Sequence, residues 1–174
     1  MNASGINRHH ILLLDNHAHD RQTLKQGLAD LGFETISEAA DPIAALDIMH
    51  DQAVDTLITE RYIPFVKFLR TSEKRPAAYI PIIMVCGKKV QAKVQEAIDA
   101  GVNRVIIKPV MAENLRTNIQ RVLDEPQPFV ESAAYIGPDR RRSENTATQH
   151  KAKTNDEPDL RLTAEEIAVL LERT

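Results

Sequence analysis

The sequence predicts an α/β fold, a doubly wound sheet of five parallel strands with helices on both faces. Three short apolar runs end abruptly at polar or charged residues, and segments with helical periodicity separate runs of this kind. Strands buried on both faces of a parallel sheet read as continuous apolar runs, and ligands gather at their carboxyl ends. The three runs are 11–14 before Asp15, 57–58 before Thr59 and Glu60, and 105–107 before Lys108.

The first strand–helix unit begins with the strand at 11–14. Leu24, Leu28 and Leu31 then recur at helical spacing, so they form one apolar face of a helix. Gly32 follows directly, and a glycine after the last periodic residue is a common helix stop. The sequence therefore predicts a helix with a left-handed stop at Gly32.

The second and third strands flank a helix with a clear start signal. Residues 34–38 form the second strand. Asp41 stands directly before Pro42, and an aspartate N-cap followed by a proline in the first turn opens a helix, which runs through Met49. Residues 54–60 form the third strand.

The remaining elements complete the alternation of strands and helices. A short helix covers 65–69, and the fourth strand covers 80–86, with Pro81 near its start. Two further apolar stripes at helical spacing predict helices before and after the strand at 105–107. The first stripe, which stops at Gly101, contains Val90, Val94, Ala97 and Ile98, and the second contains Met111, Leu115, Ile119 and Val122.

The composition changes after Asp124. Residues 143–155 contain no aliphatic residue larger than alanine, so they cannot bury enough apolar surface to offset the entropy of ordering. Thr163 and Glu166 have the spacing of a capping box, which predicts a short helix that must dock on its own domain or on a partner. We expect a disordered N-terminus (1–8), one domain (9–124), a flexible linker (125–161) and a short amphipathic C-terminal helix (162–173).

Composition narrows the class of protein. The chain has 174 residues, of which 43% are hydrophobic and 27% are charged, as in globular proteins. A net charge of -3 provides no overall attraction to nucleic acid or to an anionic membrane. The single Cys86 excludes an intramolecular disulfide, and the apolar stretches are too short to span a membrane. Because residues 1–10 lack a signal-peptide pattern, we expect a cytoplasmic protein.

The residues at the strand ends carry a resemblance to a known family: Asp15 and Asn16 follow the first strand, Glu60 ends the third, Cys86 ends the fourth, and Lys108-Pro109 follows the fifth. Over residues 9–124 this pattern resembles the CheY-like receiver domain of two-component response regulators. That family has an acidic pair, an aspartate, a Ser or Thr, and Lys-Pro at these places. The resemblance implies the flavodoxin-like strand order 2-1-3-4-5. It also implies a crevice in which a histidine kinase phosphorylates the aspartate and acidic residues hold Mg²⁺.

Several residues of this pocket depart from the family pattern. Asn16 replaces one acid, which should weaken Mg²⁺ binding because the ion prefers charged oxygen ligands. Glu60 stands in the phosphoacceptor place with one extra methylene, which moves its carboxylate out of position for in-line attack. Cys86 offers a weakly donating thiol in place of a hydroxyl. We expect Lys108 to form a constitutive ion pair with Glu60, and any metal at Asp15 and Glu60 to be weakly held.

Histidines near the first strand suggest a different kind of metal site. His17 and His19 follow the strand and the pair His9-His10 precedes it, so a transition-metal site can be drawn with Asp15 and Glu60. The spacing matches no zinc motif such as HExxH, so we interpret these residues as exposed loop histidines. We likewise interpret the thiol at the end of the fourth strand as a packed residue and not as a reactive group.

Three adjacent arginines, Arg140, Arg141 and Arg142, form the second notable feature. They follow a Gly-Pro turn at 137–138, and guanidinium groups suit phosphate or carboxylate partners. Similar Gly-Pro-Asp-Arg-Arg tails follow receiver domains in some bacterial proteins, and arginine-rich receiver tails in one such group bind cyclic di-GMP. The alternatives are a solvated linker, a protein contact, and a phosphorylated ligand such as cyclic di-GMP. DNA is not expected, because the sequence lacks a helix-turn-helix and aromatic interleaving.

These features predict a degenerate receiver that binds a signalling protein, such as a histidine kinase, a chemotaxis protein or an output protein, and that is not an enzyme. Val105 takes the place of the aromatic switch residue, so ring rotation has no counterpart, and no cofactor is required. The alternatives are a weakly phosphorylatable, switchable receiver and a sensor of a phosphorylated ligand. A flavodoxin-like enzyme is disfavoured because no nucleophile–base pair or glycine-rich phosphate loop is present. The expected contact face is that of the fourth helix, fifth strand and fifth helix, with these polar contributors: Lys88, Lys89, Lys93, Arg104, Asn118 and Arg121.

Overall fold

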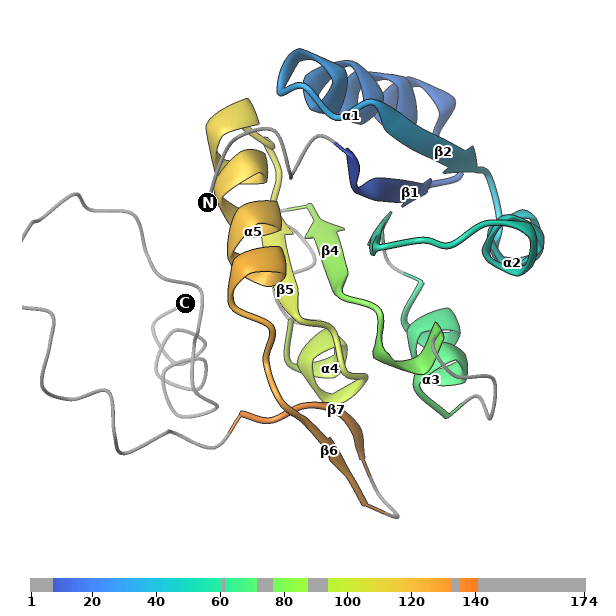
Figure 1. Cartoon of the computed structure of the whole chain (residues 1–174), viewed down its shortest axis with the longest axis vertical. Helices are drawn as coiled ribbons and strands as arrows, with labels where there is room; N and C mark the ends of the chain where they lie inside the picture. The colour runs from blue at the N-terminus through green and yellow to red at the C-terminus, as the bar shows by residue number, and fades with distance from the viewer. Residues whose placement is uncertain (1–7, 61, 72–76, 88–93, 133–134, 141–174) are drawn as a thin grey trace, which may run out of the picture.

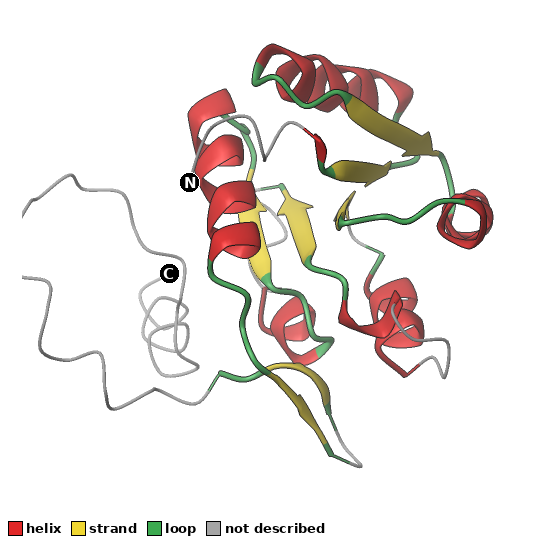
Figure 2. Cartoon of the chain, in the orientation of Figure 1, coloured by secondary structure: helices red, strands yellow, loops and turns green. Residues whose placement is uncertain are grey.

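A parallel five-stranded sheet forms the centre of the protein, as predicted (Figures 1 and 2). The structure is a computed structural model that describes residues 8–60, 62–71, 77–87, 94–132 and 135–140. The strand order is β2-β1-β3-β4-β5, so the implied order 2-1-3-4-5 is confirmed. The strands are His10–Leu14 (β1), Thr35–Ala39 (β2), Thr56–Glu60 (β3), Ile82–Cys86 (β4) and Arg104–Ile107 (β5).

Helices alternate with these strands along the chain and cover both faces of the sheet (Figure 2). Their positions agree with the predicted ones to within a few residues, and residues 88–93, where the fourth helix was expected to begin, lie outside the described residues. The helices are Ala18–Asp30 (α1), Pro42–Asp51 (α2), Ile63–Thr71 (α3), the short 3-10 helix Ala77–Tyr79 (η2), Val94–Asp99 (α4) and Ala112–Asp124 (α5).

Alternate residues of the strands supply two hydrophobic cores, one on each face of the sheet. Leu12 and Leu57 pack with α2, α3 and α4, whereas Leu13 and Ile58 pack with α1 and α5. All four side chains are at most 1% exposed. Burial of each contributes about 1.5–3 kcal/mol to the free energy of unfolding. Because both faces are buried, the strands β1 and β4 read as nearly continuous apolar runs.

The predicted helix boundaries have the expected local chemistry. Asp41 caps α2, since its side chain accepts hydrogen bonds from the backbone N–H groups of Ile43 and Ala44, each at 2.9 Å. Gly32 ends α1 with a φ of 92°, a left-handed conformation that favours glycine. One expected core residue is wrong: Met111 precedes α5 and is 65% exposed, so the apolar stripe of this helix begins at Leu115.

A β-hairpin follows α5, in the region 125–161 where we expected a flexible linker. The strands β6 (Phe129–Glu131) and β7 (Ile136–Pro138) pair antiparallel. The Phe129 ring lies edge-on to the ring of Tyr79, with 5.3 Å between the ring centres. The linker prediction is therefore wrong for 129–131 and 136–138, because aromatic contacts to the domain replace the missing aliphatic core. The rest of the linker, from 141, and the predicted helix at 162–173 lie outside the described residues, as do residues 1–7.

Arg70 connects α3 to the segments at the amino ends of β4 and β5. Its side chain is only 2% exposed and donates hydrogen bonds to the carbonyl oxygens of Ala78, Ile80 and Gly101 and to Oδ1 of Asn103, at 2.8–3.0 Å. Burial lowers the pKa of this guanidinium to about 10. The guanidinium carbon Cζ of Arg70 also lies 4.9 Å from the centre of the Phe129 ring of the hairpin, within cation–π range.

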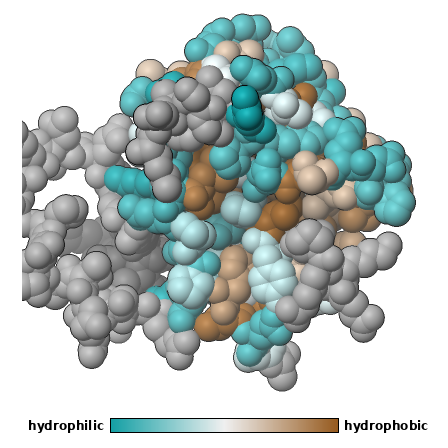
Figure 3. Space-filling view, viewed as in Figure 1, coloured by the Kyte–Doolittle hydropathy of each residue, from teal (hydrophilic) through white to brown (hydrophobic). Residues whose placement is uncertain are grey.

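The visible surface is mixed in character (Figure 3). Hydrophilic residues cover the exposed side of α1, and hydrophobic residues show mainly in the middle of the molecule, where the sheet lies. Among the helices that the structure describes, none has the length and apolar character needed to cross a bilayer.

Candidate functional site

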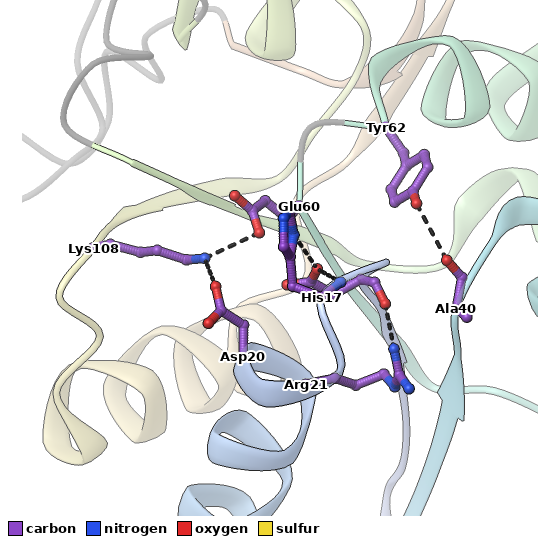
Figure 4. Close-up of polar contacts among 8 residues, drawn as sticks. His17, Asp20, Arg21, Ala40, Glu60, Tyr62 and Lys108 are labelled. Atoms are coloured by element: carbon purple, nitrogen blue, oxygen red, sulfur yellow. Dashed lines mark hydrogen bonds and ion pairs between the residues drawn. The ribbon is translucent and has the colours of Figure 1, made fainter.

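The candidate site lies at the carboxyl ends of β1, β3 and β5 (Figure 4). Asp15 follows β1, Glu60 ends β3 and Lys108 follows β5, so the parallel sheet brings these three residues to one edge as the sequence predicts. Lys108 Nζ lies 3.0 Å from Glu60 Oε2. The expected ion pair is therefore present, and the Glu60 side chain in it is only 10% exposed.

Asp20 is a second carboxylate partner of Lys108 that the sequence reasoning missed. Lys108 Nζ donates to Asp20 Oδ2 at 2.5 Å, and Asp20 stands in the first turn of α1. This hydrogen bond lowers the pKa of Asp20. Partial burial alone would lower the pKa of Lys108, but its hydrogen bonds to Asp20 and Glu60 outweigh that effect and raise it. The ammonium is thus held charged between two carboxylates.

Asp15 is the most deeply buried acid of the site, with 2% of its surface exposed. Its Oδ1 accepts a hydrogen bond from the backbone N–H of His17 at 2.8 Å, and His17 Nδ1 lies 3.3 Å from the same oxygen. Its Oδ2 is buried and has no hydrogen-bond partner among the described residues. One oxygen of this carboxylate is therefore fixed by the backbone, and the other is buried without a hydrogen bond from the described residues.

Arg21 supports Asp15 from the side of β2. Its Nη1 donates to the backbone carbonyl oxygen of Asp15 at 2.6 Å, and its Nε donates to Glu38 Oε2 at 3.2 Å. Glu38 also accepts a hydrogen bond from Lys25 at 2.5 Å. The Lys25 contact, followed by that of Arg21, lowers the pKa of Glu38. This ion-pair group fixes the start of α1 against β2.

The other predicted pocket residues lie in different surroundings. Asn16 is exposed, so the amide in the place of the second acid faces solvent. Cys86 is 1% exposed and packs in the core on the α2, α3 and α4 side of the sheet, as a packed thiol would. Val105 is buried in the same core. Tyr62, which was not predicted, donates from its hydroxyl to the carbonyl oxygen of Ala40 at 3.3 Å (Figure 4).

The histidines divide into two kinds. His10 is not a loop histidine: it lies in β1, is 7% exposed, and its ring nitrogens contact Ala53 O and Ser37 Oγ, each at 2.8 Å. His17 and His19 are exposed, as expected. His17 nevertheless lies beside the crevice acids, because one donor atom each of Asp15, His17 and Glu60 lie within 4.8 Å of one another.

The expected contact face needs correction. Arg104 and Asn118 are 6% and 7% exposed, so neither side chain is available to a partner at the surface. Asn118 instead donates to the carbonyl oxygen of Asn114 at 2.9 Å within α5. Arg121 is exposed on the same helix. The three lysines expected on this face, Lys88, Lys89 and Lys93, lie outside the described residues.

Only one of the three tail arginines is described. Arg140 donates from Nη2 to the carbonyl oxygen of Val102, at the amino end of β5. Arg141 and Arg142 lie outside the described residues. The first arginine of the triplet therefore contacts the domain's own backbone. This contact lies at the opposite end of the strands from the crevice.

Known proteins share this fold. The family "Response regulator receiver domain" matches residues 11–120. The chain belongs to this family. It is 30% identical over 120 residues to the chemotaxis protein CheY of Pseudomonas aeruginosa, a match that covers 66% of this chain and 95% of that protein. It is 33% identical over 119 residues to CheY1 of Helicobacter pylori, covering 65% and 95%.

Solved structures agree with this assignment. The chemotaxis response regulator CheY4 of Vibrio cholerae superposes with a TM-score of 0.58 and 26% identity, covering 66% of this chain and 98% of that one. The putative response regulator of Chloroflexus aurantiacus gives a TM-score of 0.63 at 20% identity, which shows a shared fold. The chain is thus a CheY-like receiver domain of two-component signalling.

The Mg²⁺ that the family implies does not fit this crevice well. Mg²⁺ demands near-ideal octahedral oxygen coordination and is usually bound through one or two carboxylates. Here the amide of Asn16 faces solvent, and Lys108 already lies 3.0 Å from Glu60. The third donor near the two acids is an imidazole nitrogen of His17. The donor set is therefore mixed and differs from the all-oxygen set that Mg²⁺ prefers.

Proposed function

We propose that this receiver domain acts by binding a signalling protein, in a state that does not depend on phosphorylation. One observation carries the proposal: the carboxylate in the phosphoacceptor place, that of Glu60, lies 3.0 Å from Lys108 Nζ. Asp20 holds the same ammonium from the other side. The lysine that would pair with a phosphoryl group thus already has two anionic partners.

The remaining parts of the pocket support the same proposal. Phosphoryl transfer depends mainly on positioning and on electrostatic stabilisation of the transferred group. Glu60 is longer than an aspartate by one methylene, Cys86 brings no hydroxyl, and Val105 brings no aromatic ring to rotate. A domain without these parts has no evident means of reporting phosphorylation, so binding without catalysis is the function that its geometry supports best.

The partner is a signalling protein that recognises the face of α4, β5 and α5, with Arg121 as its described polar contributor. This rests on Arg121 being exposed on α5. Cyclic di-GMP binding through Arg140, Arg141 and Arg142 stays a separate prediction. The hydrogen bond from Arg140 to Val102 disfavours it, because part of that guanidinium already donates to the backbone of the domain.

The proposal is tested by incubating the full chain with acetyl phosphate and Mg²⁺ and measuring the intact mass. We expect no added phosphoryl group. CheY of Pseudomonas aeruginosa, treated in parallel, serves as the control for the reagent. Glu60→Asp should not restore modification, because Asn16 and Cys86 are still in place. A stoichiometric, acid-labile adduct on Glu60 would contradict the proposal and support a switchable receiver.

A further inference from the structure

The crevice brings together two carboxylates and one imidazole. One donor atom each of Asp15, His17 and Glu60 lie within 4.8 Å of one another, and they come from the β1–α1 turn and the end of β3. We propose that these three residues bind a divalent first-row transition ion, represented by Zn²⁺, in preference to Mg²⁺. This goes beyond the proposed function, since it gives the crevice a ligand of its own.

Asp15 has a buried carboxylate oxygen without a hydrogen bond from the described residues. A buried carboxylate oxygen without a hydrogen bond is costly, and such groups in native proteins call for an explanation such as a bound ion. Asp15 is 2% exposed, and its Oδ2 has no hydrogen-bond partner within the part of the chain that the structure describes. A cation held between this carboxylate and Glu60 would satisfy it.

The third donor of the cluster, His17, favours a transition ion over Mg²⁺. Imidazole suits Zn²⁺, Cu²⁺ and Ni²⁺, whereas carboxylate, carbonyl and water ligands suit Mg²⁺. The His17 backbone is fixed by its 2.8 Å hydrogen bond to Asp15 Oδ1, and its ring Nδ1 lies 3.3 Å from that oxygen. An ion with about 2.1 Å ligand bonds requires donor atoms no more than about 4.2 Å apart. The His17 side chain is 53% exposed and can make the small rotation that this requires.

Lys108 would compete with a bound cation for Glu60 (Figure 4). Lys108 Nζ lies 3.0 Å from Glu60 but also 2.5 Å from Asp20, so it can give up the first carboxylate and keep the second. Ion binding then replaces the contact between Glu60 and Lys108 with a contact between Glu60 and the ion, and the ammonium remains paired with Asp20. Removal of this competing ammonium should tighten ion binding.

Calorimetry on the untagged full chain with ZnCl₂ and with MgCl₂ tests the proposal. We expect one Zn²⁺ per chain at the crevice and at least tenfold weaker Mg²⁺ binding. His17→Ala should weaken Zn²⁺ binding by more than about tenfold, since loss of even an outer-shell partner of a metal site costs about 10–100-fold. His19→Ala, a neighbouring exposed histidine outside the cluster, is the matched control and should bind as the wild type does. Lys108→Met should bind Zn²⁺ more tightly.

A spectroscopic readout identifies the ligand directly. Cu²⁺ bound to the wild-type chain should show nitrogen hyperfine coupling in its electron paramagnetic resonance spectrum, and this coupling should disappear in His17→Ala but persist in His19→Ala. The proposal is overturned if no Zn²⁺ binds, if His17→Ala binds it as tightly as the wild type, or if Mg²⁺ binds equally well. Phosphorylation is measured by mass, so failure here is distinguishable from failure of the proposed function.

Discussion

Lys108 has two carboxylate partners of very different exposure, and this decides which contact matters for stability. Glu60 is 10% exposed and Asp20 is 38% exposed at the side chain. Removal of one partner from a largely buried ion pair leaves an uncompensated charge, so we expect Lys108→Ala and Glu60→Gln each to lower the free energy of unfolding by about 1–3 kcal/mol. Urea denaturation of the two single variants and of the double variant measures this.

Asp20→Asn is the matched control for that experiment. Exposed ion pairs contribute about 1 kcal/mol or less, so this variant should change the free energy of unfolding by less than Glu60→Gln does. The double variant of Lys108 and Glu60 should show a coupling energy of about 0.5–3 kcal/mol. Additive effects with no coupling would mean that the pair contributes nothing in solution.

Glu38 gives the protein a pH dependence at acid pH. Its pKa is lowered from 4.5 by Lys25 and Arg21, so it binds protons less readily in the folded than in the unfolded chain. The stability that it contributes is present above pH 4.5 and is lost as the pH falls through its folded-state pKa. We expect Glu38→Gln to be less stable than the wild type at neutral pH and to lose less stability on acidification. Denaturation at neutral pH and at several pH values below 4.5 checks this.

The residues of the site were predictable only where they end strands. Asp15, Glu60 and Lys108 each follow an apolar run, and the sheet must bring such positions to one edge. Asp20 and His17 belong to the turn and first helical turn after β1, so their approach to the crevice depends on how α1 packs. An acid in the first turn of the helix after the first strand is the signal that would have indicated Asp20.

The amino-acid composition of residues 125–161 did not predict the β6–β7 hairpin. Prolines and polar residues in this region suggested a linker, but Phe129 contacts both Tyr79 and Arg70. These partners are distant in sequence, and no local periodicity reports them. A cation–π contact and an aromatic pair together contribute about 1–3 kcal/mol, enough to hold a short hairpin on a formed domain.

This predicts a difference between two truncated chains. A chain that ends at residue 125 loses the hairpin, whereas one that ends at residue 140 keeps it. We expect the shorter chain to have a free energy of unfolding lower by about 2 kcal/mol than the longer one, from the lost contacts of Phe129. Thermal and urea denaturation measure both chains, and Phe129→Leu in the longer chain should lose part of the same amount. Equal stabilities would show that the hairpin does not contribute.

At the scale of the whole molecule, the fold was predictable because its strands are buried on both faces. Every residue of β1 and β3 and all of β5 but its last residue are buried, so the sequence shows three apolar runs with polar ends. The edge strand β2 has only one buried residue, Ala39, yet its predicted bounds of 34–38 differ by only one residue from the observed Thr35–Ala39. The residues that would define a partner surface were harder to predict, because burial of Arg104 and Asn118 depends on the packing around them.

If the partner binds the face of α4, β5 and α5, the effect of a charge reversal on partner capture should depend on which face of the sheet carries it. Arg121→Glu reverses the charge of an exposed residue on α5. Lys67→Glu reverses the charge of an exposed residue on α3, which covers the other face of the sheet. We expect Arg121→Glu to reduce capture of the partner from an extract of the source cell, because interface charges steer association, and Lys67→Glu to leave it unchanged. Reduction of capture by both variants to the same extent would contradict the assigned face.

The hydrogen bond from Arg140 to Val102 fixes where residues beyond 140 leave the domain. That point is at the amino end of β5, whereas Lys108 marks its carboxyl end, and six residues of extended chain separate the two by about 20 Å. This distance exceeds the Debye length of about 8–10 Å at ordinary ionic strength, so charges at one end are screened from those at the other. A ligand captured beyond residue 140 and an ion captured in the crevice would therefore bind with little direct electrostatic coupling. Any cooperativity between them would have to be transmitted through the packed structure of the domain.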